Sequence, residues 1–408
     1  MRVLARLPAV MILLYPALAQ GFAGCSTVQI AGPGAHVAEE GSNPIRLGKY
    51  VYAGFAEGTD VGVVASSDWG RTITAPIILS DGGGQDRDVR FAAGGANAYA
   101  LWAKYEADGV HAFFSASHNH GLSWDTATDL GLKRPSTLMQ IAADGNAVHI
   151  AYLTNDGNVS IRNSSDGGRT ISPLIPIAPA AAEIVIASLG HDVYLAWGIN
   201  DGRADTVFAR SHDGGVTFKQ QNLTEARPSG SNEPILSIEP ASGRISLVWR
   251  EDVPLQAIYL QSLDRGETWS APLIVAEPAR QVMVADGGSE IYISFLRPTA
   301  VDRHNDFQVY LTSSKDGGKS FAPAVNLSGP TGLRHLDGDF QRPIPWVDAT
   351  TGAFRLTAVA ADGVRVWNGK KGHVYPPVFL GPGMQASPAY NSVVFEGPNA
   401  TVLYGICH

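Results

Sequence analysis

The stretch that decides the fold is Ser211-His212-Asp213-Gly214-Gly215-Val216-Thr217-Phe218, one of six copies of a short pattern in this chain of 408 residues. The other copies lie at 66–72, 117–124, 164–170, 262–269 and 314–321. Their central Asp or Asn residues are separated by 51, 47, 47, 51 and 52 residues. A fixed period of about 50 residues is typical of a β-propeller, in which each repeat forms one four-stranded sheet.

Each copy, which we call a repeat turn, has the composition of a tight hairpin turn. Its Asp carboxylate is expected to accept N–H groups of the turn, and a glycine to adopt a positive φ. The Ser and Thr hydroxyls are expected to bind the remaining polar groups. An aromatic residue ends four of the copies and is expected to pack between neighbouring sheets. Since this chemistry is structural, we predict neither a metal site nor a cofactor.

Runs rich in Val, Ile, Tyr and Phe precede the repeat turns, as expected for β-strands. A seventh repeat at 344–372 lacks a repeat turn, and one more hairpin follows at 392–406. We therefore predict an all-β propeller of seven blades, with eight or six blades as the alternatives. The C-terminal hairpin is expected to close the ring together with an N-terminal strand near 27–31.

The composition supports one large domain. No low-complexity linker divides residues 25–408, which we assign to a single propeller of repeats of about 50 residues. The net charge is −8 and the sequence contains no basic cluster, which argues against a nucleic-acid partner. We expect a monomer.

Residues 1–24 have the pattern of a signal peptide. Arg2 and Arg6 precede an apolar stretch at 9–19 that is too short to span a bilayer as a mature helix. Ala17-Leu18-Ala19 offers an ordinary signal-peptidase site, whereas Phe22-Ala23-Gly24-Cys25 resembles a bacterial lipobox. The lipobox would attach a lipid to Cys25, the only membrane anchor that we expect. Both routes export the protein to the bacterial periplasm or cell surface.

The two cysteines, Cys25 and Cys407, lie at the two ends of the mature chain. Because a propeller brings its ends together when the ring closes, a disulfide between them is the alternative to lipidation of Cys25. The sequence leaves both possibilities open.

By its repeat turns, which match the Asp-box motif, the chain resembles the sialidase superfamily of β-propellers. This resemblance implies an exo-glycosidase that cleaves a terminal acidic sugar. Sialidases use a Tyr nucleophile polarised by a Glu, an Asp as acid/base, and three Arg residues that hold the sugar carboxylate. In such propellers the site lies on the face opposite the repeat turns.

The resemblance extends to particular residues. Asn232-Glu233, followed by Trp249-Arg250, is similar to the segments that supply the family's Glu and one of its Arg residues. Ala389-Tyr390-Asn391-Ser392 is similar to the segment that carries the nucleophile. The catalytic residues implied are Tyr390, Glu233 and Asp60, and the substrate-binding residues implied are Arg46, Arg250 and Arg303.

Two functions are compatible with the sequence. One whole repeat separates Arg303 from Tyr390, which would rotate these two residues apart around the ring. We therefore favour a propeller that binds a glycan, or an extracellular or cell-surface protein, without catalysis. The alternative is a sialidase-like exo-glycosidase that uses the Tyr/Glu pair.

Overall fold

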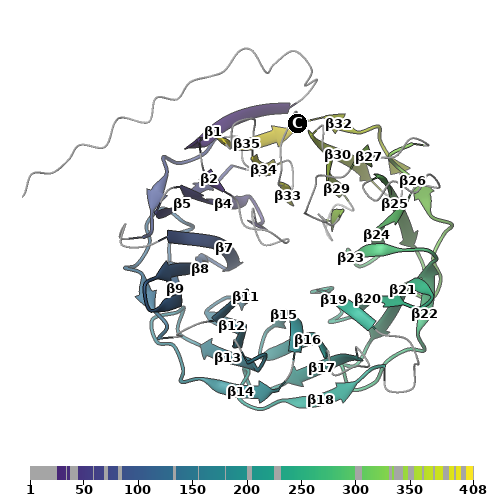
Figure 1. The fold of residues 1–408 in the computed structure, drawn as a ribbon, viewed down its shortest axis with the longest axis horizontal. Coiled ribbons are helices and arrows are strands. Elements are labelled where there is room, and N and C mark those ends of the chain that lie inside the picture. The colour runs from purple at the N-terminus through teal and green to yellow at the C-terminus, as the bar shows by residue number, and fades with distance from the viewer. Residues whose placement is uncertain are drawn as a thin grey trace, which may run out of the picture.

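A computed structural model provides the structure of the chain and shows a closed ring of β-sheets (Figure 1). It describes residues 25–33, 35–36, 45–57, 59–68, 72–80, 85–131, 135–154, 156–179, 181–199, 205–224, 231–298, 306–329, 333–334, 343–347, 353–360, 363–370, 373–379, 386–389, 392–396 and 401–407. Within these residues no helix has the length and apolarity needed to span a membrane.

Seven sheets are each built from one continuous part of the chain, and we number them in chain order. Sheet 1 contains β2 (Ala35–His36), β3 (Ile45–Leu47), β4 (Tyr50–Glu57), β5 (Asp60–Ser66) and β6 (Ile77–Ile78). Sheet 2 contains β7 (Gln85–Gly94), β8 (Asn97–Glu106), β9 (Gly109–Ser117) and β10 (Thr128–Asp129). Sheet 3 contains β11 (Pro135–Asp144), β12 (Ala147–Thr154), β13 (Val159–Ser164) and β14 (Ile175–Ala178). Sheet 4 contains β15 (Ala181–Leu189), β16 (Asp192–Ile199), β17 (Asp205–Ser211) and β18 (Lys219–Asn222).

The next three sheets follow the same order. Sheet 5 contains β19 (Ser231–Ile238), β20 (Ile245–Asp252), β21 (Leu255–Ser262) and β22 (Leu273–Ala276). Sheet 6 contains β23 (Arg280–Asp286), β24 (Ile291–Pro298), β25 (Asp306–Ser314), β26 (Val325–Asn326) and β27 (Leu333–Arg334). Sheet 7 contains β28 (Ile344–Val347), β29 (Ala353–Ala360), β30 (Gly363–Lys370), β31 (His373–Val374) and β32 (Val378–Phe379).

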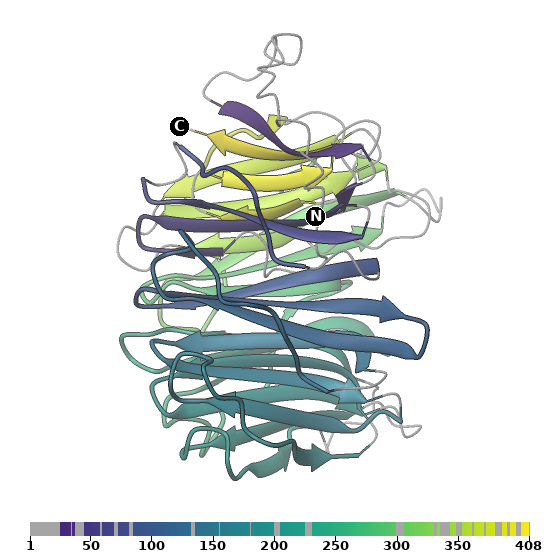
Figure 2. The ribbon, with the colours of Figure 1, turned by 90° about the vertical axis from the view of Figure 1, so that its left-hand side faces the viewer.

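Sheet 8 joins the two ends of the chain. It contains β33 (Ala386–Ala389), β34 (Ser392–Glu396) and β35 (Thr401–Cys407), and β1 (Cys25–Pro33) pairs with β35. Figures 1 and 2 both place the yellow C-terminal strands beside the purple N-terminal ones. The predicted closure of the ring by the C-terminal hairpin and an N-terminal strand is therefore confirmed.

The all-β propeller fold is confirmed, and the sheets of the described residues number eight. Seven of them are the repeats that the sequence predicts, built from continuous segments. The terminal hairpin forms a complete further sheet with β33 and β1, rather than completing one of the seven. The ring therefore matches eight blades, the alternative to our preferred seven.

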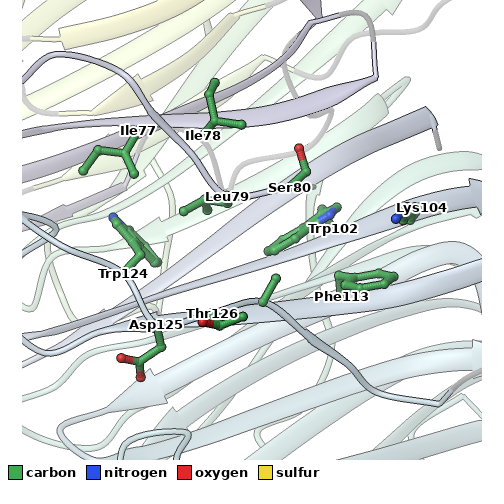
Figure 3. A pocket seen from close by; sticks show the side chains of 11 residues that line it. Ile77, Ile78, Leu79, Ser80, Trp102, Lys104, Phe113, Trp124, Asp125 and Thr126 are labelled. Carbon is green, nitrogen blue, oxygen red and sulfur yellow. The ribbon is translucent and has the colours of Figure 1, made fainter. Parts of the chain in front are cut away.

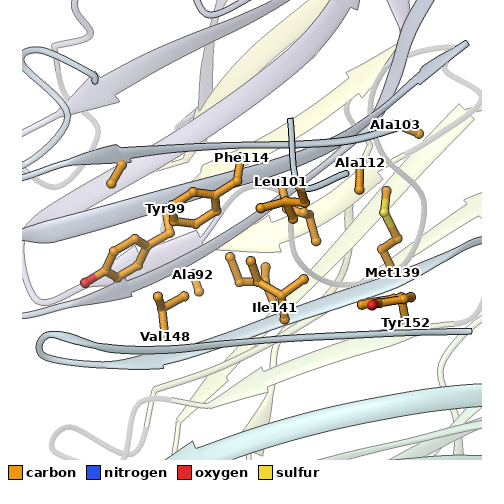
Figure 4. Packing of buried hydrophobic residues seen from close by; sticks show 13 residues of the cluster. Ala92, Tyr99, Leu101, Ala103, Ala112, Phe114, Met139, Ile141, Val148 and Tyr152 are labelled. Carbon is orange, nitrogen blue, oxygen red and sulfur yellow. The ribbon is translucent and has the colours of Figure 1, made fainter. Parts of the chain in front are cut away.

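The core lies between successive sheets. Between sheets 2 and 3, Leu101 and Phe114 from one sheet pack against Ile141, Val148 and Tyr152 from the next (Figure 4). Burying a side chain such as Leu or Ile completely contributes about 1.5–3 kcal/mol. Sheets 1 to 7 share such clusters with their neighbours along the chain, so this part of the ring depends on the contacts between sheets.

The repeat turns have the predicted hydrogen bonds. In the turn at 211–218, the carboxylate of Asp213 accepts the backbone N–H of Thr217 at 2.9 Å and the Thr217 hydroxyl at 2.6 Å. The Ser211 hydroxyl donates to the same carboxylate at 2.6 Å and accepts the N–H of Gly215 at 2.9 Å. Each turn is thus closed by its own side chains.

The repeat turns of sheets 2 to 6 also dock on the preceding sheet. A Cβ added at Gly168, whose φ is +85°, would lie 2.7 Å from the ring of Phe114, so only glycine fits. The ring of Trp269 packs edge-on against Phe208 with centroids 4.8 Å apart. The aromatic residues of the repeat turns therefore pack between sheets, as predicted.

Candidate functional site

The two faces of the ring carry different loops. Repeat turns follow the third strand in sheets 1 to 6, so they share one face. The inner strands begin on the other face, which also carries the turns between second and third strands. We call this the distal face, because it lies away from the repeat turns. Loops held by a rigid scaffold commonly carry binding residues, so the distal face is the expected place for a site.

The inner strands are irregular where they begin on the distal face. In five sheets the pairing between first and second strands shifts there, at Arg87/Arg90, Pro135/Met139, Ala181/Glu183, Asn232/Ile235 and Arg280/Met283. Such bulges bend a strand and re-aim its side chains. Their recurrence shows that the bulge itself belongs to the repeat architecture.

Two of the bulges contain a residue with a left-handed backbone. Glu233 in β19 has a φ of 60° and Gln281 in β23 has a φ of 50°. A non-glycine residue in this region costs about 1–2 kcal/mol. The two strands belong to the neighbouring sheets 5 and 6 (Figure 1). Backbone strain of this kind persists only where the surrounding structure holds it, and it is concentrated at functional sites.

Arg250 connects Glu233 to a second carboxylate. Its Nη1 donates to Oε1 of Glu233 at 2.9 Å, and its Nε donates to Oδ1 of Asp252 at 2.9 Å. The Arg250 and Glu233 side chains are 19% and 14% exposed, whereas that of Asp252 is 44% exposed. Charge-assisted hydrogen bonds between partly buried groups fix the orientation of the guanidinium plane. Glu233, Arg250 and Asp252 therefore form a polar group that presents hydrogen-bond donors and acceptors in fixed orientations at its exposed edge.

The polar group continues towards sheet 6. Arg250 lies on the side of sheet 5 that carries Ala257 and Tyr259, which pack against sheet 6. In sheet 6, Arg297 donates to the carbonyl of Pro278 at 3.0 Å, and its guanidinium lies 4.4 Å from the centre of the Tyr310 ring. We call the set formed by these charged side chains the sheet 5–6 patch: Glu233, Arg250, Asp252 and Arg297.

Of the predicted site residues, the structure brings Glu233 and Arg250 together. Asp60 begins β5 in sheet 1, where it accepts a hydrogen bond from the Ser80 hydroxyl at 3.2 Å. In a ring of eight sheets, three sheets separate it from Glu233 in either direction (Figure 1). Asp60 and Glu233 thus come from different sheets of the ring.

The other predicted residues are less fully described. Arg46 lies in β3, where it pairs with Val51, and its side chain is outside the description. Arg303 and Tyr390 lie outside the described residues. The backbone of Cys25 is in direct register with Cys407, and the side chains of both lie outside the description.

Sequence reasoning gave no role to Asp252 or Gln281. Asp252 lies outside the segments that carry the resemblance, and Gln281 has no charge that would single it out. The Glu233-Pro234 dipeptide was the one available signal, since proline cannot donate to the sheet and often accompanies a bulge.

A separate pocket of about 360 Å³ lies between sheets 1 and 2 (Figure 3). Trp102, Phe113 and Trp124 line it on the side of sheet 2, and Ile77 and Leu79 on the side of sheet 1. The indole N–H of Trp124 is buried without a hydrogen-bond partner. The pocket is a gap between two packed sheets, and it lies away from the strained strands of sheets 5 and 6.

No known protein family and no curated protein matches the sequence. Among solved structures, a Hadza microbial sialidase is similar at 13% identity, with 87% of this chain and 73% of that chain covered and a TM-score of 0.42. YCF48 bound to D1 peptide is similar at 14% identity, covering 97% and 100%, with a TM-score of 0.45. The β-propeller domain of the Trilobed protease from Pyrococcus furiosus is similar at 11% identity, covering 78% and 91%, with a TM-score of 0.47. The similarity is to sialidases and other β-propellers, and it concerns the fold alone.

Proposed function

We propose that this chain is an exported propeller that binds a glycan on the sheet 5–6 patch without cleaving it. The observation that carries the proposal is the position of Arg250, held at 2.9 Å by Glu233 and at 2.9 Å by Asp252. An arginine already neutralised by two carboxylates is poorly suited to hold the carboxylate of an acidic sugar, because the neighbouring charges repel it. The same array suits sugar hydroxyls, which donate and accept hydrogen bonds at once.

The charge of the patch supports a neutral ligand. Glu233 and Asp252 are offset by Arg250 and Arg297, so the patch has little net charge but several fixed polar groups. The strained φ of Glu233 supports the same interpretation, since strain is retained where it positions a group for binding. An extracellular protein is the alternative ligand.

The partner of Glu233 supports binding over hydrolysis. In the sialidase mechanism that the resemblance implies, this Glu polarises a Tyr nucleophile. Here Oε1 of Glu233 accepts a hydrogen bond from Nη1 of Arg250 at 2.9 Å, as in a group that orients polar side chains for a ligand.

A glycan array probed with the mature protein tests the proposal, followed by calorimetry with the strongest ligand. Arg250→Gln should weaken binding about 10-fold or more, because it removes the guanidinium that both carboxylates bind and that orients them. Arg169→Gln is the matched control, since Arg169 lies on the face of the repeat turns and donates to the carbonyl of Asp166. Equal affinities for wild type and Arg250→Gln would contradict the proposal, as would hydrolysis of an aryl sialoside that Glu233→Gln abolishes.

A further inference from the structure

The hairpin between β8 and β9 carries a cluster of side chains outside the sheet 5–6 patch. Glu106 ends β8, Asp108 lies in the turn, and His111 follows in β9. One nitrogen or oxygen atom from each of these three side chains lies within 4.8 Å of the others. The cluster is on the distal face, because this turn joins second and third strands.

The distances in the cluster are those of ligands around a cation. Nε2 of His111 lies 3.0 Å from Oδ1 of Asp108 and 3.8 Å from Oε2 of Glu106. Ligand atoms about 2.1 Å from one metal ion are about 3.0 Å apart in octahedral geometry and about 3.4 Å apart in tetrahedral geometry. The His111–Asp108 distance matches octahedral geometry, and the Glu106 oxygen lies 3.8 Å from His111, slightly farther than the tetrahedral spacing.

Each side of the cluster is oriented by a neighbour. Nδ1 of His111 faces Oδ2 of Asp129 at 3.2 Å, and the other oxygen of Asp129 accepts the N–H of Gly131 at 2.8 Å. A proton on Nδ1 that is donated to Asp129 leaves the Nε2 lone pair directed at Asp108 and Glu106. Metal-binding histidines commonly have such a carboxylate behind them.

Lys104 orients the Glu106 carboxylate, as Asp129 orients the His111 ring. Its Nζ lies 3.1 Å from Oε1 of Glu106, while Oε2 faces His111. The ammonium group therefore binds one carboxylate oxygen and fixes the other for a ligand. Lys104 is itself held, since it is 4% exposed and lies 5.0 Å from the centre of the Phe113 ring.

We propose that Glu106, Asp108 and His111 bind one divalent transition-metal ion, for which Zn²⁺ is the best match. Imidazole together with two carboxylates favours Zn²⁺ or Mn²⁺ over the all-oxygen sites of Ca²⁺. His111 is 6% exposed, and the Asp108 and Glu106 side chains are 53% and 33% exposed. The ion would therefore enter from solvent, with water completing its coordination. It would tie the β8–β9 hairpin together at the distal face.

Calorimetric titration of the chelator-treated mature protein with ZnCl₂ tests this site. We expect one ion per chain and a melting temperature that rises with ZnCl₂. His111→Gln and the turn variant Asp108→Asn should abolish the binding, and Asp129→Asn should weaken it about 10- to 100-fold. Asp108 lies in an exposed turn, so its variant keeps the test valid if His111→Gln fails to fold.

His212→Gln is the matched control. The ring of His212 also faces two carboxylates, Asp192 at 2.8 Å and Glu267 at 3.5 Å. Two guanidinium groups, those of Arg265 and Arg210, already offset these two carboxylates, whereas Lys104 offsets only one of the three carboxylates around His111. The His212→Gln variant should therefore bind Zn²⁺ like the wild type. A wild type that takes up no Zn²⁺, or an equal loss of binding in His212→Gln and His111→Gln, would overturn the site. So would a His111→Gln variant that binds as well as the wild type.

Discussion

At the scale of single residues, the pKa of Asp166 links a repeat turn to the acid stability of the fold. Hydrogen bonds from the Thr170 side chain, the Thr170 backbone and Ser164 lower its pKa to about 2. A carboxyl group whose pKa is lower in the folded than in the unfolded state stabilises the fold above the unfolded pKa, about 3.9. This stabilisation is lost as the pH falls through the folded value.

We therefore predict that Asp166→Asn changes the pH dependence of stability below pH 4. The wild type should lose free energy of unfolding from about pH 4 towards pH 2, and the variant should lose less over the same interval. Urea unfolding at a series of pH values measures the difference. Thr170→Val, which removes the largest cause of the low pKa, should shift the profile in the same direction. Parallel profiles for all three proteins would show that the turn carboxylate has no such role.

At the scale of the element, the turns themselves predict a stabilising substitution. Arg265 has a φ of 61° at a position where three other turns have glycine, Gly167, Gly214 and Gly317. Its Nε lies 3.5 Å from Asp192 and its side chain is 69% exposed, so its ion pair contributes little. Arg265→Gly should raise the free energy of unfolding by about 0.5–1 kcal/mol, because it relieves the left-handed backbone. Chemical denaturation checks this, and a loss of stability would argue against strain at this position.

The docking of the turns predicts a matched pair of destabilising substitutions. Gly168→Ala should cost more than Gly214→Ala, although both glycines have positive φ values of 85° and 74°. An added Cβ at Gly168 meets the Phe114 ring at 2.7 Å, whereas at Gly214 it meets nothing within 4 Å. Overpacking typically adds about 1–3 kcal/mol to the backbone cost. Equal losses of unfolding free energy in the two variants, measured by denaturant unfolding, would mean that the turn does not pack against the preceding sheet.

Local patterns made most elements predictable, and long-range pairings limited the rest. The strands and turns of sheets 1 to 6 follow from the repeat of hydrophobic runs and of Asp and Gly positions. Strand β33 (Ala386–Ala389) is short and contains Pro388, so nothing in the sequence marked it as the inner strand of an eighth sheet. The resemblance placed Glu233 and Arg250 in one site, but their ion pair and the bulge in β19 depend on the neighbouring strands. The ligand pattern of Glu106, Asp108 and His111 was missed because it lies outside the repeat turns.

At the scale of the whole molecule, the closing sheet predicts a covalent bridge. The backbone pairs Cys25 directly with Cys407 in an antiparallel ladder. Such partners have Cα atoms about 4.5–5.5 Å apart, within the range for a disulfide. A bridge over nearly the whole mature chain would contribute about 4–5 kcal/mol on the chain-entropy model.

We therefore predict that the exported protein has a mass two hydrogens below that of its reduced form. Cys407→Ser should lower the melting temperature of the oxidised protein and leave that of the reduced protein nearly unchanged. Intact-mass spectrometry and thermal unfolding, each with and without reductant, measure both effects. An acylated Cys25 together with a free thiol at Cys407 would contradict the bridge and support the lipid anchor.

Glycan binding without cleavage at the sheet 5–6 patch is tested most directly by one saturation-transfer NMR time course. The mature protein is incubated for a day with the strongest ligand from the glycan array, and in parallel with 3′-sialyllactose. We predict that magnetisation is transferred from the protein to the array ligand, that Arg250→Gln abolishes this transfer, and that Arg169→Gln retains it. Every sugar signal should be unchanged at the end of the incubation. Signals of a released sugar in either sample, or transfer that is the same in the Arg250→Gln variant, would contradict it.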